Sequence, residues 1–264
     1  MSTQNPTCRL TAMAHIFIIG DSIAEGYFDT SGGWVKRLQN KLAEERFETL
    51  TNGTKISLDF FRNLSIAGDT ITNAIHRVEN EANYRIYDKT DLNIPILAMG
   101  INDSKLDDLE TAKDITSGEI PNGGSDLKEP LAHVSLGNFE RAFHKMIEIL
   151  ARVFNEDNNH QTDIFILELS PCKSTVTDDG DNFHVEPRVA LFNNKIKELT
   201  SSINESRTYK NQLIFIPLRK AFEESEHSFD YMFKDGLHPW EDGHELIANE
   251  AFKYLFPYLA QTKL

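Results

Sequence analysis

A serine, a histidine and an aspartate stand at positions where they could perform acyl transfer. Ser22 comes directly after the apolar run 15–19, so its hydroxyl lies where a buried strand has to turn. Asp235 and His238 are three residues apart. Within one turn, this spacing lets the carboxylate accept the Nδ1 proton of the imidazole while Nε2 faces a serine. Serine acyl transfer needs a nucleophile, a base and a group that orients the base, and the chain offers a candidate for each role.

Two further residues could stabilise the oxyanion of such a reaction. Asn102 follows a predicted strand and can offer its side-chain amide. Gly68 can offer a backbone N–H with no Cβ in the way of an approaching ligand. Each short pattern alone has an ordinary structural explanation, because a G-D-S tripeptide often forms a turn or a helix cap and a D-x-x-H pair often precedes a helix. Their joint occurrence indicates a serine hydrolase.

The elements that would position these residues alternate between strand and helix. Short apolar runs with β-branched or aromatic content predict strands, at residues 16–19, 56–61, 94–99, 164–169 and 213–217. Helical periodicity predicts helices at residues 34–45, 71–82, 186–203 and 240–259, the last with a possible end near Pro257. A stripe of apolar side chains predicts one more helix and belongs to the core: Phe139, Phe143, Met146, Leu150 and Val153.

This alternation predicts an α/β protein, in which a parallel sheet is covered by helices on both faces. The catalytic loops should then gather at the carboxyl ends of the strands. We expect a single domain over residues 1–264 with a tail at 1–14. Long segments at 104–137 and 171–187 each begin just after a predicted strand. We expect at least one of them to form a wall of the substrate pocket or a lid, and a solvated surface excursion is the alternative.

Composition narrows the possible partners. The chain has 264 residues and a formal net charge of −14, with a pI near 5.1. A field of this sign repels nucleic acids and anionic membrane surfaces. No apolar run is long enough for a membrane span. The N-terminus has no signal-peptide pattern, so we expect a cytoplasmic protein, although a chain trimmed of its leader would look the same.

The two cysteines suggest neither a metal site nor a redox pair. Cys8 and Cys172 are far apart and form no C-x-x-C motif. We expect two free thiols, with a single disulfide as the alternative. The expected chemistry needs no metal and no cofactor.

Four short blocks resemble, in order, those of the SGNH or GDSL hydrolases. They are Gly20-Asp21-Ser22-Ile23, the segment 63–69 with Gly68, Gly100-Ile101-Asn102-Asp103, and Asp235 to Pro239. Asp242-Gly243-His244 also resembles a pattern that often follows the last block. The resemblance covers residues 15 to about 250 and implies a three-layer α/β/α sandwich with a flavodoxin-like, five-stranded parallel sheet. The G-x-S-x-G elbow of α/β-hydrolases is absent.

The resemblance also implies a role for each residue. Ser22 would be the nucleophile, His238 the general acid and base, and Asp235 its orienting group. The oxyanion hole would consist of the Ser22 and Gly68 N–H groups and Asn102 Nδ2. Asp21 and Asp103 would stabilise turns.

The implied activity is hydrolysis of carboxylic esters or thioesters, with a small-molecule ester or an acylated carbohydrate as substrate. A carbohydrate O-acetylesterase of the same family is one alternative, and a catalytically dead flavodoxin-like binding module is another. The sequence fixes neither the acyl chain length nor the oligomeric state.

Overall fold

The five predicted strands form one sheet in the computed structural model, which describes residues 13–49, 57–86, 91–106, 133–155, 162–173, 184–233 and 235–261. All strand pairs are parallel, and the strand order is β2-β1-β3-β4-β5. The strands span Met13–Gly20 (β1), Ser57–Asn63 (β2), Leu92–Ala98 (β3), Ile164–Leu167 (β4) and Leu213–Ile216 (β5).

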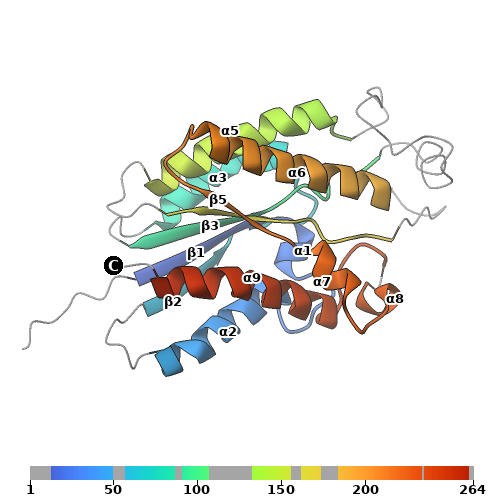
Figure 1. Ribbon diagram of the computed structural model, residues 1–264, viewed down its shortest axis with the longest axis horizontal. Helices are drawn as coiled ribbons and strands as arrows, with labels where there is room; N and C mark the ends of the chain where they lie inside the picture. Colours follow the sequence, from blue (N-terminus) through green and yellow to red (C-terminus); the bar gives the residue numbers. More distant parts are fainter. Residues whose placement is uncertain are drawn as a thin grey trace, which may run out of the picture.

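Helices cover both faces of this sheet, as Figure 1 shows. One face carries α3 (Ile71–Arg85), α5 (Leu136–Asn155) and α6 (Glu186–Ser206). The other face carries α2 (Gly33–Thr49) and α9 (Glu241–Gln261). Single helical turns lie between the longer elements, namely α1 (Ser22–Glu25), α7 (Arg219–Glu223) and α8 (Phe229–Met232). The predicted three-layer α/β/α sandwich is therefore confirmed.

Alternating side chains on the strands explain why both faces are covered. In β1, Phe17 and Ile19 pack into the core beneath α3, α5 and α6, whereas Ile16 and Ile18 pack into the core beneath α2 and α9. All four side chains are fully buried. Because both sides of the strand are apolar, each face of the sheet needs a helical layer to exclude water.

The order of the strands reverses at β1. The chain passes from β1 to its neighbour β2 and then crosses to β3 on the other side of β1. In open α/β sheets, ligands bind beyond the carboxyl end of the strand where the order reverses. That end is Gly20, and Ser22 lies two residues beyond it.

Some predicted boundaries were wrong. Helix α9 continues through Pro257 to Gln261 instead of ending near the proline. Leu259 is buried in the core beyond it, and the Tyr258 hydroxyl accepts a hydrogen bond from Asp163 N at 3.0 Å. These tertiary contacts hold the last turn in place, although the proline cannot donate a backbone hydrogen bond.

The long segments 104–137 and 171–187 end earlier than predicted, because α5 already begins at Leu136 and α6 at Glu186. The Arg188 side chain connects the two described ends of the segment 104–137. Its guanidinium donates to Ser104 O at 3.0 Å and to Val134 O at 3.1 Å. Residues 107–132 and 174–183 lie outside the described residues, so their role as pocket walls or a lid stays a prediction.

Cys172 is a buried free thiol, whereas Cys8 lies outside the described residues. In the part of the chain that the structure describes, no helix combines the length and the apolar character needed to cross a membrane.

Candidate active site

Ser22 stands in the tight turn that connects β1 to the first short helix. It is the first residue of α1, and the Asp21 carboxylate caps this helix by accepting a hydrogen bond from Ile23 N at 3.0 Å. A Cβ on Gly20 would lie only 2.4 Å from the Ala24 Cβ. Glycine at position 20 therefore lets the chain fold back closely enough to present the serine at the sheet edge.

His238 and Asp235 complete a chain of hydrogen bonds that starts at Ser22. The Ser22 Oγ lies 2.8 Å from His238 Nε2, and His238 Nδ1 lies 2.6 Å from Asp235 Oδ2. The serine is separated from the histidine by 216 positions in the sequence. The fold thus brings together the three residues that the sequence predicts as a catalytic group.

The turn that holds Asp235 and His238 differs in detail from the prediction. Asp235 Oδ1 accepts hydrogen bonds from Leu237 N at 2.9 Å and from His238 N at 2.7 Å. The carboxylate is therefore fixed by the backbone as well as by the imidazole ring. Helix α9 begins at Glu241, one residue later than predicted, and Glu241 and Asp242 lie in its first turn.

The electrostatics of this pair favour an oriented, proton-accepting histidine. Burial alone raises the pKa of Asp235, but the hydrogen bonds from the His238 ring and from two backbone N–H groups outweigh it and lower the pKa to about 2. Asp235 is therefore a carboxylate at neutral pH. It holds the proton of the neutral imidazole on Nδ1, which leaves the Nε2 lone pair to accept the Ser22 proton.

Gly68 lies in the loop after β2, next to the Ser22 turn. Ile66 N donates to Gly20 O at 3.2 Å, and Ala67 N donates to Glu25 Oε2 at 3.1 Å. Gly68 has a φ of 78°, and a Cβ at this position would meet nothing within 4 Å. The backbone conformation, rather than crowding, is what requires glycine here.

Asn102 joins the same loop from the end of β3. Its Nδ2 donates to Asp69 O at 3.0 Å. An amide nitrogen carries two hydrogens, so this bond leaves one N–H for another acceptor. The neighbouring Asp103 accepts hydrogen bonds from Ile71 N at 3.0 and 3.2 Å. Both predicted oxyanion donors therefore lie in loops at the carboxyl edge of the sheet.

Asp21 and Asp103 make the backbone contacts expected of turn-stabilising residues. Both are buried, and burial raises the pKa of each to about 7. Hydrogen bonds from backbone N–H groups, chiefly those of Ile23 and Ile71, oppose this effect.

Sequence reasoning missed two aromatic residues that surround the histidine. The Tyr27 ring stacks on His238 with a centroid distance of 5.4 Å, and the Phe28 ring meets it edge to face at 5.5 Å. Tyr27 and Phe28 are 47% and 46% exposed, so both present apolar surface beside His238. Phe28 has a φ of 62°, a left-handed conformation that is unusual for a bulky residue. Their position shortly after Ser22 was the only signal in the sequence.

His244 connects the elements that carry the candidate triad. It is fully buried in α9, and its Nδ1 accepts a hydrogen bond from Trp34 N at 3.3 Å. Its Nε2 lies 3.1 Å from Tyr27 O. The sequence Asp242-Gly243-His244 pointed to this residue without indicating its contacts. Through them, the helix that follows His238 is attached to the loop that follows Ser22.

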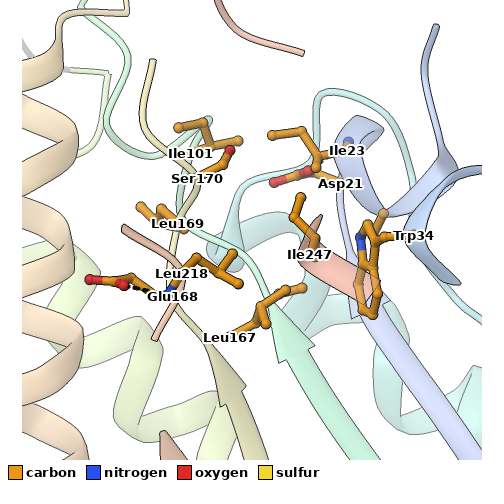
Figure 2. Close-up of a pocket in the computed structure, with 12 residues that line it drawn as sticks. Asp21, Ile23, Trp34, Ile101, Leu167, Glu168, Leu169, Ser170, Leu218 and Ile247 are labelled. Carbon is orange, nitrogen blue, oxygen red and sulfur yellow. Dashed lines mark hydrogen bonds between the residues drawn. The ribbon is translucent and has the colours of Figure 1, made fainter. Parts of the chain in front are cut away.

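A small cavity lies between the Ser22 turn and the ends of β3 and β4. Figure 2 shows apolar side chains around it, together with Asp21 and Ser170, whereas the Glu168 carboxylate points away from it. Its volume is about 20 Å³, which is room for about one water molecule. Within the described ranges, the buried Ser170 Oγ has no hydrogen-bond partner. This cavity is too small for an acyl chain.

Comparisons with known proteins identify the family of this chain. The model of the GDSL-like Lipase/Acylhydrolase family matches residues 16–251, and the chain belongs to this family. It is therefore a carboxylic ester hydrolase. A search of curated proteins gives no match.

Solved structures share the fold at low sequence identity. A protein from Parabacteroides merdae, described as a GDSL-like lipase, is 17% identical with a TM-score of 0.61, over 94% of this chain and 98% of that one. The acetylxylan esterase Axe2 from Geobacillus stearothermophilus is 15% identical with a TM-score of 0.59, over 94% of each chain. The psychrotrophic esterase EstA from Pseudoalteromonas is 16% identical with a TM-score of 0.53, over 93% of this chain and 98% of that one.

Proposed function

We propose that the chain is a serine esterase in which Ser22, His238 and Asp235 form the catalytic triad. The observation that carries this proposal is the hydrogen-bonded series from Ser22 Oγ through the imidazole to Asp235, with distances of 2.8 and 2.6 Å. Such an arrangement activates a serine hydroxyl because the base is both close and oriented.

The reaction proceeds in two steps. Ser22 Oγ attacks the ester carbonyl carbon while its proton passes to His238 Nε2. The Ser22 and Gly68 N–H groups and Asn102 Nδ2 donate to the oxyanion. His238 then protonates the departing alcohol, and an acyl-serine remains. A water molecule, deprotonated by the same imidazole, releases the acid and restores the serine.

We infer a polar alcohol part for the substrate. The rings of Tyr27 and Phe28 offer an exposed aromatic surface next to His238, and sugar rings often stack on such a surface. An acetylated carbohydrate is therefore a second candidate beside a simple ester. The structural likeness to an acetylxylan esterase is consistent with it.

Hydrolysis of 4-nitrophenyl acetate tests the proposal. We expect Ser22→Ala and His238→Ala each to lower kcat by at least about 10³-fold, because each removes a group that takes part in bond formation or proton transfer. Ser170→Ala is the matched control, since it removes another buried hydroxyl at the same sheet edge, and it should retain activity. Full activity of Ser22→Ala would refute the assignment.

A further inference from the structure

A polar groove lies between α3 and α5, beside the candidate oxyanion hole. Its volume of about 630 Å³ is in the range of small-molecule sites. Its wall includes Thr70, which directly follows Asp69 in the chain. The carbonyl of Asp69 is the group that holds the Asn102 amide at 3.0 Å. The groove wall therefore begins one residue along the chain from the group that holds Asn102.

The described lining of the groove has a charge opposite to that of the whole chain. Its polar lining comes from α3, from the segment that leads into α5 and from α5 itself, and includes Thr72, Asn73, His76, His133, Asn138 and Arg141. The lining that the structure describes contains no Asp or Glu, although the chain carries a net charge of −14. Such a local reversal of sign concentrates anions.

The acidic residues of the two flanking helices do not neutralise this charge. Each carboxylate of α3 and α5 forms an ion pair with a cation that does not line the groove: Glu79 with Arg152, Glu81 with Arg77, Glu140 with Lys195, and Glu148 with Lys145. Arg141 donates to the neutral amide oxygen of Asn138. Among the described residues, no carboxylate pairs with Arg141.

Positive charge also lies between the groove and the triad. His133 N donates to Lys105 O at 3.1 Å, so Lys105 is adjacent to the groove wall. Burial, together with the nearby charge of Lys105, lowers the pKa of His184 to about 4. His184 is therefore a neutral ring at physiological pH. The lysine and arginine cations near the groove are Lys105 and Arg141.

We propose that the groove binds a carboxylate group of the ester substrate, with Arg141 as its charged partner. The guanidinium offers paired N–H donors that match the two oxygens of a carboxylate, and the side-chain amide of Asn73 is a further donor in the same wall. This inference rests on the proposed function, because the carboxylate belongs to the molecule that Ser22 attacks. The substrate class is an ester whose acyl or alcohol part is acidic, such as an acetylated acidic sugar.

Matched ester pairs test this inference. One pair is 4-acetoxybenzoate and its methyl ester, with the charge on the alcohol part. The other is monophenyl succinate and its methyl ester, with the charge on the acyl part. For at least one pair, we expect the wild type to show a kcat/KM roughly tenfold higher for the acid, the size of one charge-assisted hydrogen bond. The preference should decrease with added salt.

Substitutions then locate the source of the preference. Arg141→Gln should bring the ratio of acid to methyl ester close to one, chiefly by lowering kcat/KM for the acid. Lys145→Gln is the matched control, because it removes the same charge one turn further along α5 from a lysine paired with Glu148. Asn73→Asp, which places a negative charge in the wall, should lower the ratio independently.

The possible results separate the two proposals. Equal rates for acid and methyl ester in both wild-type pairs would overturn the carboxylate site, as would a ratio that Arg141→Gln leaves unchanged. A loss of both rates to the same extent in Arg141→Gln would also overturn it. Failure of the proposed function has a different signature, since Ser22→Ala would then still hydrolyse the neutral methyl esters.

Discussion

The closest contact in the candidate triad, 2.6 Å between His238 Nδ1 and Asp235 Oδ2, explains why three ordinary polar residues can act as one unit. Two backbone N–H groups hold the other oxygen of the same carboxylate. The imidazole is thus oriented before any substrate arrives. Preorganisation of this kind accounts for much of the effect of serine triads, because no reorientation is needed during the reaction.

Asn102→Ala tests the oxyanion hole at the level of a single side chain. We expect kcat for 4-nitrophenyl acetate to fall by about 10² to 10³-fold, because one donor to the developing negative charge is removed. Asn102→Asp should lose at least as much, since a carboxylate would repel the oxyanion. Circular dichroism should show that both variants remain folded. A loss of less than about tenfold in Asn102→Ala would remove this residue from the oxyanion hole.

Phe28 allows strain and ring contact to be separated. Phe28→Gly and Phe28→Ala both remove the ring that lies 5.5 Å from His238, but only glycine adopts a φ of 62° without strain. We expect the glycine variant to have a free energy of unfolding about 1 kcal/mol higher than the alanine variant, measured in urea. Both should show a similar, severalfold lower kcat/KM. Equal stabilities would show that the left-handed backbone is not strained.

Residues of the candidate site were predictable where they stand in short local patterns. Ser22, Asn102 and the Asp235/His238 pair each follow a strand or precede a helix, so their positions could be inferred without long-range information. The contacts of Tyr27 and His244 could not, because they join residues more than 200 positions apart. No local pattern encodes the packing of one loop against another.

At the scale of elements, the loop after β3 is tied to the start of α3 by a buried carboxylate. Both oxygens of Asp103 accept from Ile71 N, and this contact lies beside Asn102.

The strands and long helices were predicted because their apolar periodicity is regular. The single turns α7 and α8 were missed, since four or five residues are too few to show a helical period.

Asp103→Asn should change how stability depends on pH. Burial raises the pKa of Asp103 to about 7, above the value of about 3.9 for an unperturbed aspartate. Between these values the folded state binds a proton that the unfolded state has lost, so this group makes the wild type less stable as pH rises. Asparagine keeps an acceptor oxygen and does not titrate. The variant should therefore gain stability relative to the wild type from pH 4 to 7.

Urea unfolding at a series of pH values checks this expectation. Asp21, whose pKa burial also raises to about 7, remains in the variant, so part of the pH dependence should persist. A difference between variant and wild type that is constant from pH 4 to 7 would contradict a raised pKa at Asp103.

At the scale of the whole molecule, the strand order and the charge distribution both single out the same edge of the sheet. The order reverses at β1, which places Ser22 where loops from β2 and β3 meet. The polar groove between α3 and α5 opens beside these loops and lacks acidic residues in its described lining. The overall charge was readable from the sequence, but this local reversal was not, because it depends on which side chains the fold brings together around the groove.

The most direct test of the account is covalent labelling of Ser22. We expect a fluorophosphonate to add once per chain, with loss of esterase activity, and peptide mass spectrometry to place the adduct on Ser22. Ser22→Ala should show no adduct. Modification of a different serine, together with ester hydrolysis by Ser22→Ala, would contradict the assignment of Ser22 as the nucleophile.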